Sequence, residues 1–183
     1  MRLTLLAHAE TLNSRQMIFG DESGLVSDPG VEVRASRAGL SSGPELACRQ
    51  TCRLLGGPVE VEPGLAGPYF GRWIGRSLAS VMSEDPTGVA VWLRDPDATP
   101  HGGESLAEMA GRVGRVLDEH KWPASGAIAV VSPLVVRAAL AHALDTSAAS
   151  MLRADVGPLG SVTVTRHSRQ WRLISFDRTR HTR

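Results

Sequence analysis

The chain has 183 residues, a length that suits one domain with a sizeable core, and we predict a single domain over residues 1–183. Hydrophobic residues make up 42% and charged residues 21% of the sequence, which is ordinary for a globular protein. The net charge is +1, from 20 basic and 19 acidic residues. This balance gives no general attraction to nucleic acid or to a membrane surface, so we predict neither as a partner.

Targeting and metal signals are also lacking in the sequence. There is no charged leader followed by an apolar segment and no long apolar run, so we expect a cytoplasmic protein. The two cysteines, Cys48 and Cys52, are four residues apart on a predicted helix. Two thiols alone rarely form a zinc site. We interpret them as small apolar helix residues in a reducing compartment, and we predict no metal and no cofactor.

Strands and helices alternate along the first half of the chain. Residues 2–7 are short, apolar and followed by a turn, which predicts a buried strand. Residues 12–30 contain several glycines and a proline, which predicts an irregular segment. The pattern then predicts a helix start over residues 31–39, a break at Ser41 to Pro44, a helix over 45–55 that Gly56 ends, and a short strand over 59–61.

The second half continues the alternation. Residues 63–76 are rich in glycine and aromatic residues and are predicted as a loop, and residues 77–95 as helical pieces interrupted at Pro86 and Gly88. Apolar residues at steps of three and four predict a helix over 104–120. An apolar run predicts a central parallel strand over 127–131, followed by a helix over 134–144. The last elements are a predicted edge hairpin of residues 161–165 and 170–176.

These elements predict the fold class. It is α/β, a three-layer sandwich with a mostly parallel central sheet and helices on both faces. In such a sheet, ligands bind beyond the carboxyl ends of the strands. His8, directly after the first predicted strand, is therefore the leading candidate for a site residue.

Several local strings, all in the same order, resemble motifs of the histidine phosphatase superfamily, which has the phosphoglycerate mutase-like fold. The resemblance spans nearly the whole chain. It rests on Ala7-His8-Ala9-Glu10-Thr11, Arg49-Gln50-Thr51, Phe70-Gly71-Arg72-Trp73-Ile74-Gly75, Gly102-Gly103-Glu104-Ser105, Val130-Val131-Ser132 with Val135-Val136-Arg137-Ala138, and the closing hairpin with Gly160-Ser161-Val162 and Trp171-Arg172-Leu173.

The resemblance implies a phosphoryl-accepting histidine, which is His8 here. It also implies two arginines and a second histidine to neutralise the phosphoryl oxygens, and an acid to protonate the leaving group. This sequence departs from the pattern at these four positions. The residues found there are Ala7 for the first arginine, Ala47 for the second (or Leu46 with the gap placed differently), Pro133 for the second histidine and Gly67 for the acid.

Other residues are candidates for binding a ligand near His8. They are Glu10, Thr11, Arg15, Tyr69, His101, Glu104, Ser132 and Arg137. Each also has a structural interpretation. The arginines and His101 are compatible with ordinary surface or loop positions, Glu10, Thr11 and Glu104 with helix and turn capping, and Tyr69 with packing. His8 itself is compatible with a relic residue bonded to a backbone carbonyl.

Three functions remain open at this point. The favoured one is a repurposed protein without ordinary phosphatase or mutase activity. It would bind a small molecule, or perform non-phosphoryl chemistry, in a less cationic pocket around His8. The second is a specialised phosphomonoester phosphatase with His8 as phosphoryl acceptor. The third is a non-catalytic interaction protein, and a homodimer is an open alternative for the assembly.

Overall fold

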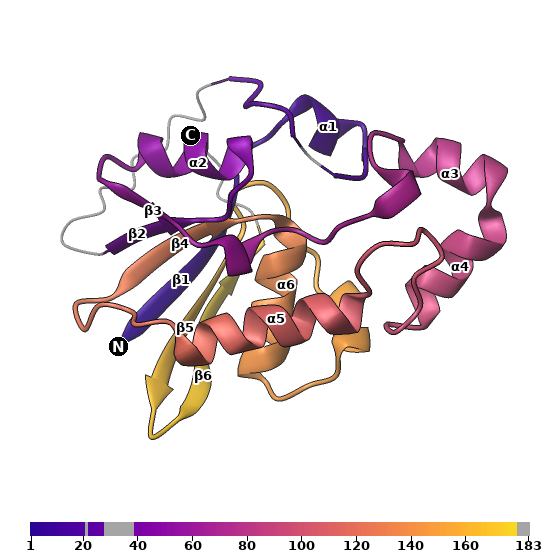
Figure 1. Ribbon diagram of the computed structural model, residues 1–183. Helices are drawn as coiled ribbons and strands as arrows, with labels where there is room; N and C mark the ends of the chain where they lie inside the picture. The colour runs from indigo at the N-terminus through magenta and orange to yellow at the C-terminus, as the bar shows by residue number, and fades with distance from the viewer. Residues whose placement is uncertain (21, 28–38, 179–183) are drawn as a thin grey trace.

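A six-stranded sheet forms the centre of the molecule (Figure 1). The computed structural model describes residues 1–20, 22–27 and 39–178. The strand order is β3-β2-β4-β1-β5-β6. The strands are β1 (Arg2–Ala7), β2 (Gly39–Ser42), β3 (Val59–Val61), β4 (Ala127–Val131), β5 (Ser161–His167) and β6 (Gln170–Asp177).

Helices connect the strands. The α-helices are α1 (Leu12–Arg15), α2 (Leu46–Leu54), α3 (Leu78–Glu84), α4 (Pro86–Arg94), α5 (Leu106–Glu119) and α6 (Pro133–Ala143). Short 3-10 helices are η1 (Pro63–Leu65), η2 (Gly71–Trp73) and η3 (Ala148–Arg153). No helix within the described ranges combines the length and apolar character that crossing a membrane requires.

The sheet is mostly parallel, as predicted. Strands β3, β2, β4 and β1 are parallel to one another, whereas β5 pairs antiparallel with both β1 and β6. The closing hairpin therefore lies at one sheet edge, as the sequence predicts. The parallel strands all end on the same side of the sheet, and His8 follows the end of β1.

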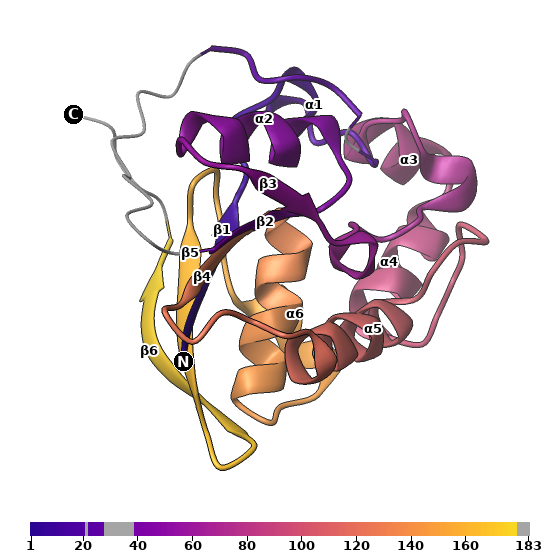
Figure 2. The ribbon, with the colours of Figure 1, turned by 60° about the vertical axis from the view of Figure 1, so that its left-hand side comes forward.

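Two hydrophobic cores flank the sheet because successive side chains of a strand point to opposite faces. Leu3, Leu5 and Ala7 of β1 join a core that includes the buried residues of α5 and α6. Leu6 of the same strand joins a second core with Cys48 and Cys52 of α2. Figure 2 shows α2 on one side of the sheet and α5 and α6 on the other, which confirms the predicted three layers.

The cysteines occupy the position that the sequence predicts. Cys48 and Cys52 are both buried on the α2 face that contacts the sheet. Burial disfavours the thiolate and raises the pKa of Cys52 to about 11. Among the described residues, no group of three or more His, Cys, Asp or Glu side chains is arranged to hold a metal ion.

The long helix α5 forms as its pattern predicts. Ser105 and Glu108 make a capping box, in which the Ser105 hydroxyl accepts from the Glu108 N–H and the Glu108 carboxylate accepts from the Ser105 N–H. The apolar stripe that begins at Leu106 is buried against α6 and η1. Most of the stability of this amphipathic helix comes from that burial rather than from helix propensity.

The sequence prediction is wrong in three places. Residues 39–42 form strand β2 instead of a break, because their hydrogen bonds to β3 and β4 hold small residues in extended form. Residues 12–15 form the short helix α1, capped by Thr11, within the segment predicted as irregular. Gly88 lies inside α4 and does not interrupt it. Of the helix start predicted over residues 31–39, residues 31–38 lie outside the described residues, and Gly39 begins β2.

Close backbone contact between two loops explains two glycines. The chain at Tyr69 to Gly71 lies against residues 101–104, where the Glu104 N–H donates to the Tyr69 carbonyl at 2.7 Å. A Cβ at Gly103 would collide with the Tyr69 carbonyl oxygen, and one at Gly71 with the His101 carbonyl oxygen. Only glycine fits at such a contact without a shift of the backbone.

We expect Gly103→Ala to destabilise the protein by more than about 2 kcal/mol, because backbone atoms cannot yield as a flexible side chain can. The matched control is Gly111→Ala on α5, where an added Cβ meets only the tip of Arg115 at 3.7 Å. That change removes a helical glycine and should stabilise by about 0.5–1 kcal/mol. Urea unfolding of both variants measures the difference, and equal stabilities would contradict this explanation of the loop contact.

Candidate functional site

The backbone of His8 is fixed on two sides at the carboxyl end of β1. Its N–H donates to the Val131 carbonyl of β4 at 2.9 Å, and its carbonyl accepts from the Leu159 N–H at 3.3 Å. The residue is only 4% exposed. The position of its imidazole is therefore set by the neighbouring strands.

One ring nitrogen of His8 is held by a short hydrogen bond. Nδ1 lies 2.8 Å from the Ala9 carbonyl oxygen. A carbonyl oxygen can only accept, so Nδ1 bears the proton in this bond. In the neutral ring, Nε2 then has the lone pair and can act as a base or a nucleophile. The bond to a backbone carbonyl fits both the catalytic and the relic interpretation of this histidine.

Helix α2 supports the turn after His8 through Thr51. The Ala9 N–H donates to the Thr51 hydroxyl at 2.9 Å, and Thr51 is fully buried. The sequence shows Thr51 only as the last residue of the Arg49-Gln50-Thr51 string, with no predicted role at the site. The Arg-Gln-Thr string was the signal for it, but its contact with the residue after His8 depends on tertiary packing.

Ser132 lies beside His8 because their strands are paired. Ala7, the last residue of β1, is in register with Val131, the last residue of β4. His8 and Ser132 directly follow these two strands. The Ser132 hydroxyl oxygen is buried and has no hydrogen-bond partner among the described residues. Pro133 follows as the first residue of α6. Of the predicted ligand-binding residues, Ser132 is thus placed next to His8.

Uncharged residues occupy the four positions where the family resemblance implies charged or polar groups. Ala7 and Ala47 are fully buried, the first in the main core and the second on α2. Pro133 begins a helix, and Gly67 lies near Ser132, whose hydroxyl would be 3.3 Å from a Cβ at position 67. None of these four can offer a cation or a side-chain hydrogen bond.

The carboxylate of Glu45, a residue predicted only as a helix start, lies close to Gly67. Glu45 precedes α2, and its Oε1 accepts from the Gly67 N–H at 2.5 Å. Its Oε2 is buried without a hydrogen-bond partner in the described part of the chain. Glutamate is unusual at this N-terminal cap position, where Ser, Thr, Asp and Asn are preferred, and Glu45 makes no cap hydrogen bond. The unusual residue type is a sequence signal that Glu45 has a role other than capping α2.

The candidates that follow His8 in sequence are engaged with one another. Thr11 caps α1 by accepting from the Ser14 N–H at 2.9 Å. Arg15 and Glu10 form an exposed ion pair of 2.6 Å. The hydrogen bond from Arg15 lowers the pKa of Glu10, and the same bond raises the pKa of Arg15. Arg15 thus has a neighbouring carboxylate that competes with any ligand anion.

His101 and Tyr69 differ sharply in their surroundings. His101 is buried against Trp73 and Phe70, with ring centroids 4.9 and 5.7 Å away. Its Nδ1 accepts from the Gly103 N–H at 2.9 Å, and burial, helped by the nearby Arg72 charge, lowers its pKa. The Tyr69 side chain is 61% exposed. The burial of His101 differs from the surface or loop position considered for it, and its Nε2 has no hydrogen-bond partner among the described residues. The exposure of Tyr69 does not fit the packing interpretation of that residue.

Glu104 forms a two-point ion pair with Arg112. The Arg112 Nε and Nη2 atoms donate to the two carboxylate oxygens at 2.8 and 2.7 Å. The remaining Arg112 nitrogen, Nη1, donates to the carbonyls of Gly64 and Ala66 at 2.8 and 3.0 Å. Glu104 therefore fixes the loop that leads to Gly67, which makes it a positioning residue.

Arg137 of α6 is partly buried, and its Nη2 lies 3.8 Å from Asp155 Oδ1. Burial lowers its pKa, although the Asp155 carboxylate opposes that shift. Its Nε is buried without a hydrogen-bond partner among residues 1–20, 22–27 and 39–178. The Nε donor of Arg137 is thus unpaired, but the Asp155 carboxylate already balances part of the guanidinium charge.

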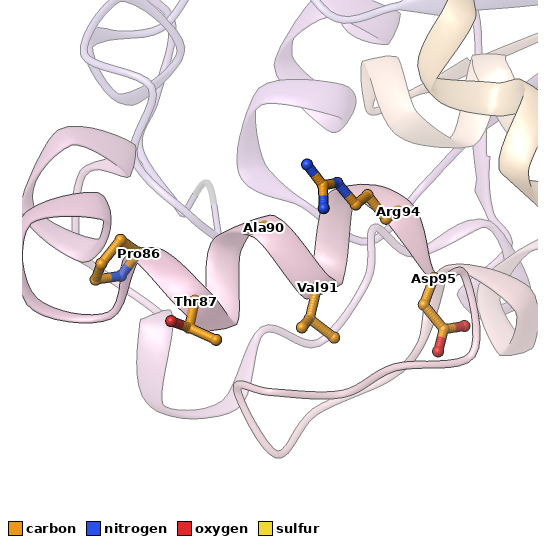
Figure 3. A pocket seen from close by; sticks show the side chains of 6 residues that line it. All are labelled: Pro86, Thr87, Ala90, Val91, Arg94 and Asp95. Carbon is orange, nitrogen blue, oxygen red and sulfur yellow. The ribbon is translucent and has the colours of Figure 1, made fainter.

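A surface pocket on α4 is distinct from the strand ends (Figure 3). It is lined by Pro86, Thr87, Ala90, Val91, Arg94 and Asp95. None of these is a predicted site residue, and only Arg94 and Asp95 have charged side chains. We therefore place the candidate site at His8 and not in this pocket.

Comparison with protein families identifies a match for most of the chain. Residues 32–179 match the model of the histidine phosphatase superfamily (branch 1). A bifunctional protein of Mycobacterium tuberculosis is 30% identical in an alignment of length 173 that covers 83% of this chain. That alignment covers 46% of the relative, so the chain spans about half the length of the curated relatives it matches.

Solved structures with the same fold include several phosphatases. A mycobacterial glucosyl-3-phosphoglycerate phosphatase has a TM-score of 0.79 at 22% identity, covering 98% of this chain and 99% of that one. The alpha-ribazole phosphatase from Shigella flexneri has a TM-score of 0.79 at 20% identity, with both chains fully covered. A phosphoserine phosphatase mutant from Entamoeba histolytica has a TM-score of 0.80 at 17% identity, with 96% of each chain covered.

We expect Thr51→Val to destabilise the protein by about 1–3 kcal/mol, because the buried Ala9 N–H loses its acceptor. Thr51→Ser keeps the hydroxyl and is the matched control, with a smaller loss from the missing methyl group. Urea unfolding gives both values. A valine variant as stable as the serine variant would show that the Ala9 to Thr51 bond does not hold the turn after His8.

Proposed function

We propose that this chain, which belongs to the histidine phosphatase superfamily (branch 1), binds a small molecule of low negative charge at its His8 site. Phosphomonoester hydrolysis at this site is then slow or absent. The observation that supports this proposal is that Ala7, Ala47, Gly67 and Pro133 stand where the family resemblance implies charged or polar groups, while the histidine at the end of β1 is retained.

The size of the expected loss follows from transition-state electrostatics. Phosphoryl transfer depends almost entirely on positioning and on neutralising charge at the phosphoryl oxygens. Removing one preorganised donor typically costs about 10²–10³ in rate. Losses within one site do not add, but the removal of every cation and of the acid together should remove most of the rate enhancement.

The arginines that might compensate are poorly placed to do so. Arg15 is paired with Glu10, and Arg137 lies near Asp155. A phosphate dianion that binds either guanidinium would compete with these carboxylates, more strongly at Arg15, whose bond to Glu10 is 2.6 Å long. The unpaired Glu45 carboxylate close to Ser132 would further repel a dianion.

A specialised phosphomonoester phosphatase is the second candidate, with His8 as phosphoryl acceptor. The comparisons support it more than the first, since several structural neighbours are phosphatases. The ring of His8 also suits it, because the Nδ1 bond to Ala9 leaves Nε2 as the nucleophilic nitrogen. The missing cations are the reason that we place it second.

We expect the wild-type protein to release phosphate from para-nitrophenyl phosphate and from a panel of sugar and amino-acid phosphates no faster than His8→Ala. Steady-state phosphate release measures both. His142→Ala controls for general effects of losing an imidazole, since His142 of α6 pairs with Asp118 of α5. Turnover that only His8→Ala abolishes would contradict the first candidate and establish the second.

A further inference from the structure

We propose that Glu45 and Ser132 form the polar subsite of the His8 site, and that it takes a hydrogen-bond-donating group of the ligand, an ammonium or a hydroxyl. This inference rests on the proposed function and narrows its ligand class. It assigns a binding role to a carboxylate that comes from a different element than the acid expected at position 67.

The carboxyl group of Glu45 occupies space that two glycines leave open. A Cβ at Gly67 would lie 3.2 Å from Glu45 Oε1, and a Cβ at Gly43 would lie 2.6 Å from Glu45 Oε2. Side chains at either position would displace this carboxyl group. The absence of an acid at position 67 and the presence of Glu45 are therefore linked by packing.

Glu45 and Ser132 converge on the same place. The point where a Gly67 Cβ would lie is 3.2 Å from Glu45 Oε1 and 3.3 Å from the Ser132 hydroxyl oxygen. Strand pairing in turn places Ser132 next to His8. Glu45, Gly67 and Ser132 are each partly exposed as residues, so the group lies near the surface, although Glu45 Oε2 and the Ser132 hydroxyl oxygen are themselves buried.

The hydrogen-bonding capacity of the pair is incomplete. Glu45 Oε1 accepts from Gly67, but Glu45 Oε2 and the Ser132 hydroxyl are buried and lack partners within the described residues. Buried polar atoms are normally hydrogen-bonded, and unpaired ones call for an explanation. A ligand group that donates to Oε2 and contacts the serine hydroxyl would satisfy both atoms.

The charge of the subsite selects for donors and against anions. No ion pair joins Glu45 to a basic side chain in the part of the chain that the structure describes. A partly buried carboxylate without a countercharge attracts an ammonium and repels a phosphate. A carboxylate also only accepts hydrogen bonds, so a hydroxyl binds it as a donor.

The experiment uses three probes, ethanolamine, ethylene glycol and inorganic phosphate, titrated into the labelled full chain. The amide resonance of Gly67 is the readout, because this N–H donates to Glu45. Glu45→Gln is the test variant, since its amide oxygen can still accept from Gly67 while the charge is lost. Glu60→Gln is the matched control, on an exposed glutamate of β3.

We expect ethanolamine to shift the Gly67 amide saturably in the wild type and in Glu60→Gln, with affinity about tenfold or more weaker in Glu45→Gln. Ser132→Ala should weaken it as well. Saturation by ethylene glycol, with the same loss in Glu45→Gln, would identify a hydroxyl as the natural donor and also support the subsite. Equal responses of the wild type and Glu45→Gln to every probe would overturn it.

Failure of this inference is distinguishable from failure of the proposed function. Phosphate turnover that requires His8 but is unchanged in Glu45→Gln, with no probe response at Gly67, would overturn both. Turnover that falls in kcat in Glu45→Gln would instead make Glu45 a proton donor to a leaving group and would overturn the subsite. Absent turnover together with equal probe responses would overturn the subsite alone.

Discussion

The pairing of β1 with β4 is the constraint on which the site depends. Its register aligns Ala7 with Val131, and the hydrogen bond from the His8 N–H to Val131 continues that register beyond the strand. Because both strands are buried and parallel, a shift by one residue would turn their apolar side chains to the wrong layers. The position of His8 beside Ser132 is thus a consequence of core packing.

Helix α2 and the loop before η2 complete the site from the other side. The Glu104 to Arg112 ion pair holds the carbonyls of Gly64 and Ala66, which fixes the loop at Gly67. Gly67 then donates to Glu45 at the start of α2. The Glu104 to Arg112 ion pair and Gly67 thus hold the Glu45 carboxylate near Ser132. The family resemblance implies arginines rather than a carboxylate at such a site.

Much of the fold was predictable because it depends on local patterns. The period of apolar residues gives α5, the apolar run after Gly126 gives β4, and alternation gives the closing hairpin. Strand β2 was missed because Ser41 and Ser42 are typical of turns, and only pairing with β3 and β4 makes them extended. His8 was found from its place after a strand. Glu45 was missed because its contact with Gly67 joins residues 22 positions apart.

Affinity for a phosphate-like anion tests the proposed loss of positive charge most directly. Orthovanadate mimics a phosphoryl group, and isothermal titration calorimetry of the wild-type protein measures its binding without requiring turnover. We predict no saturable binding in the millimolar range, because the buried Ala7 and Ala47 offer no positive charge to the anion. Submillimolar binding that His8→Ala abolishes would contradict that prediction and would show that this chain keeps a working phosphate site.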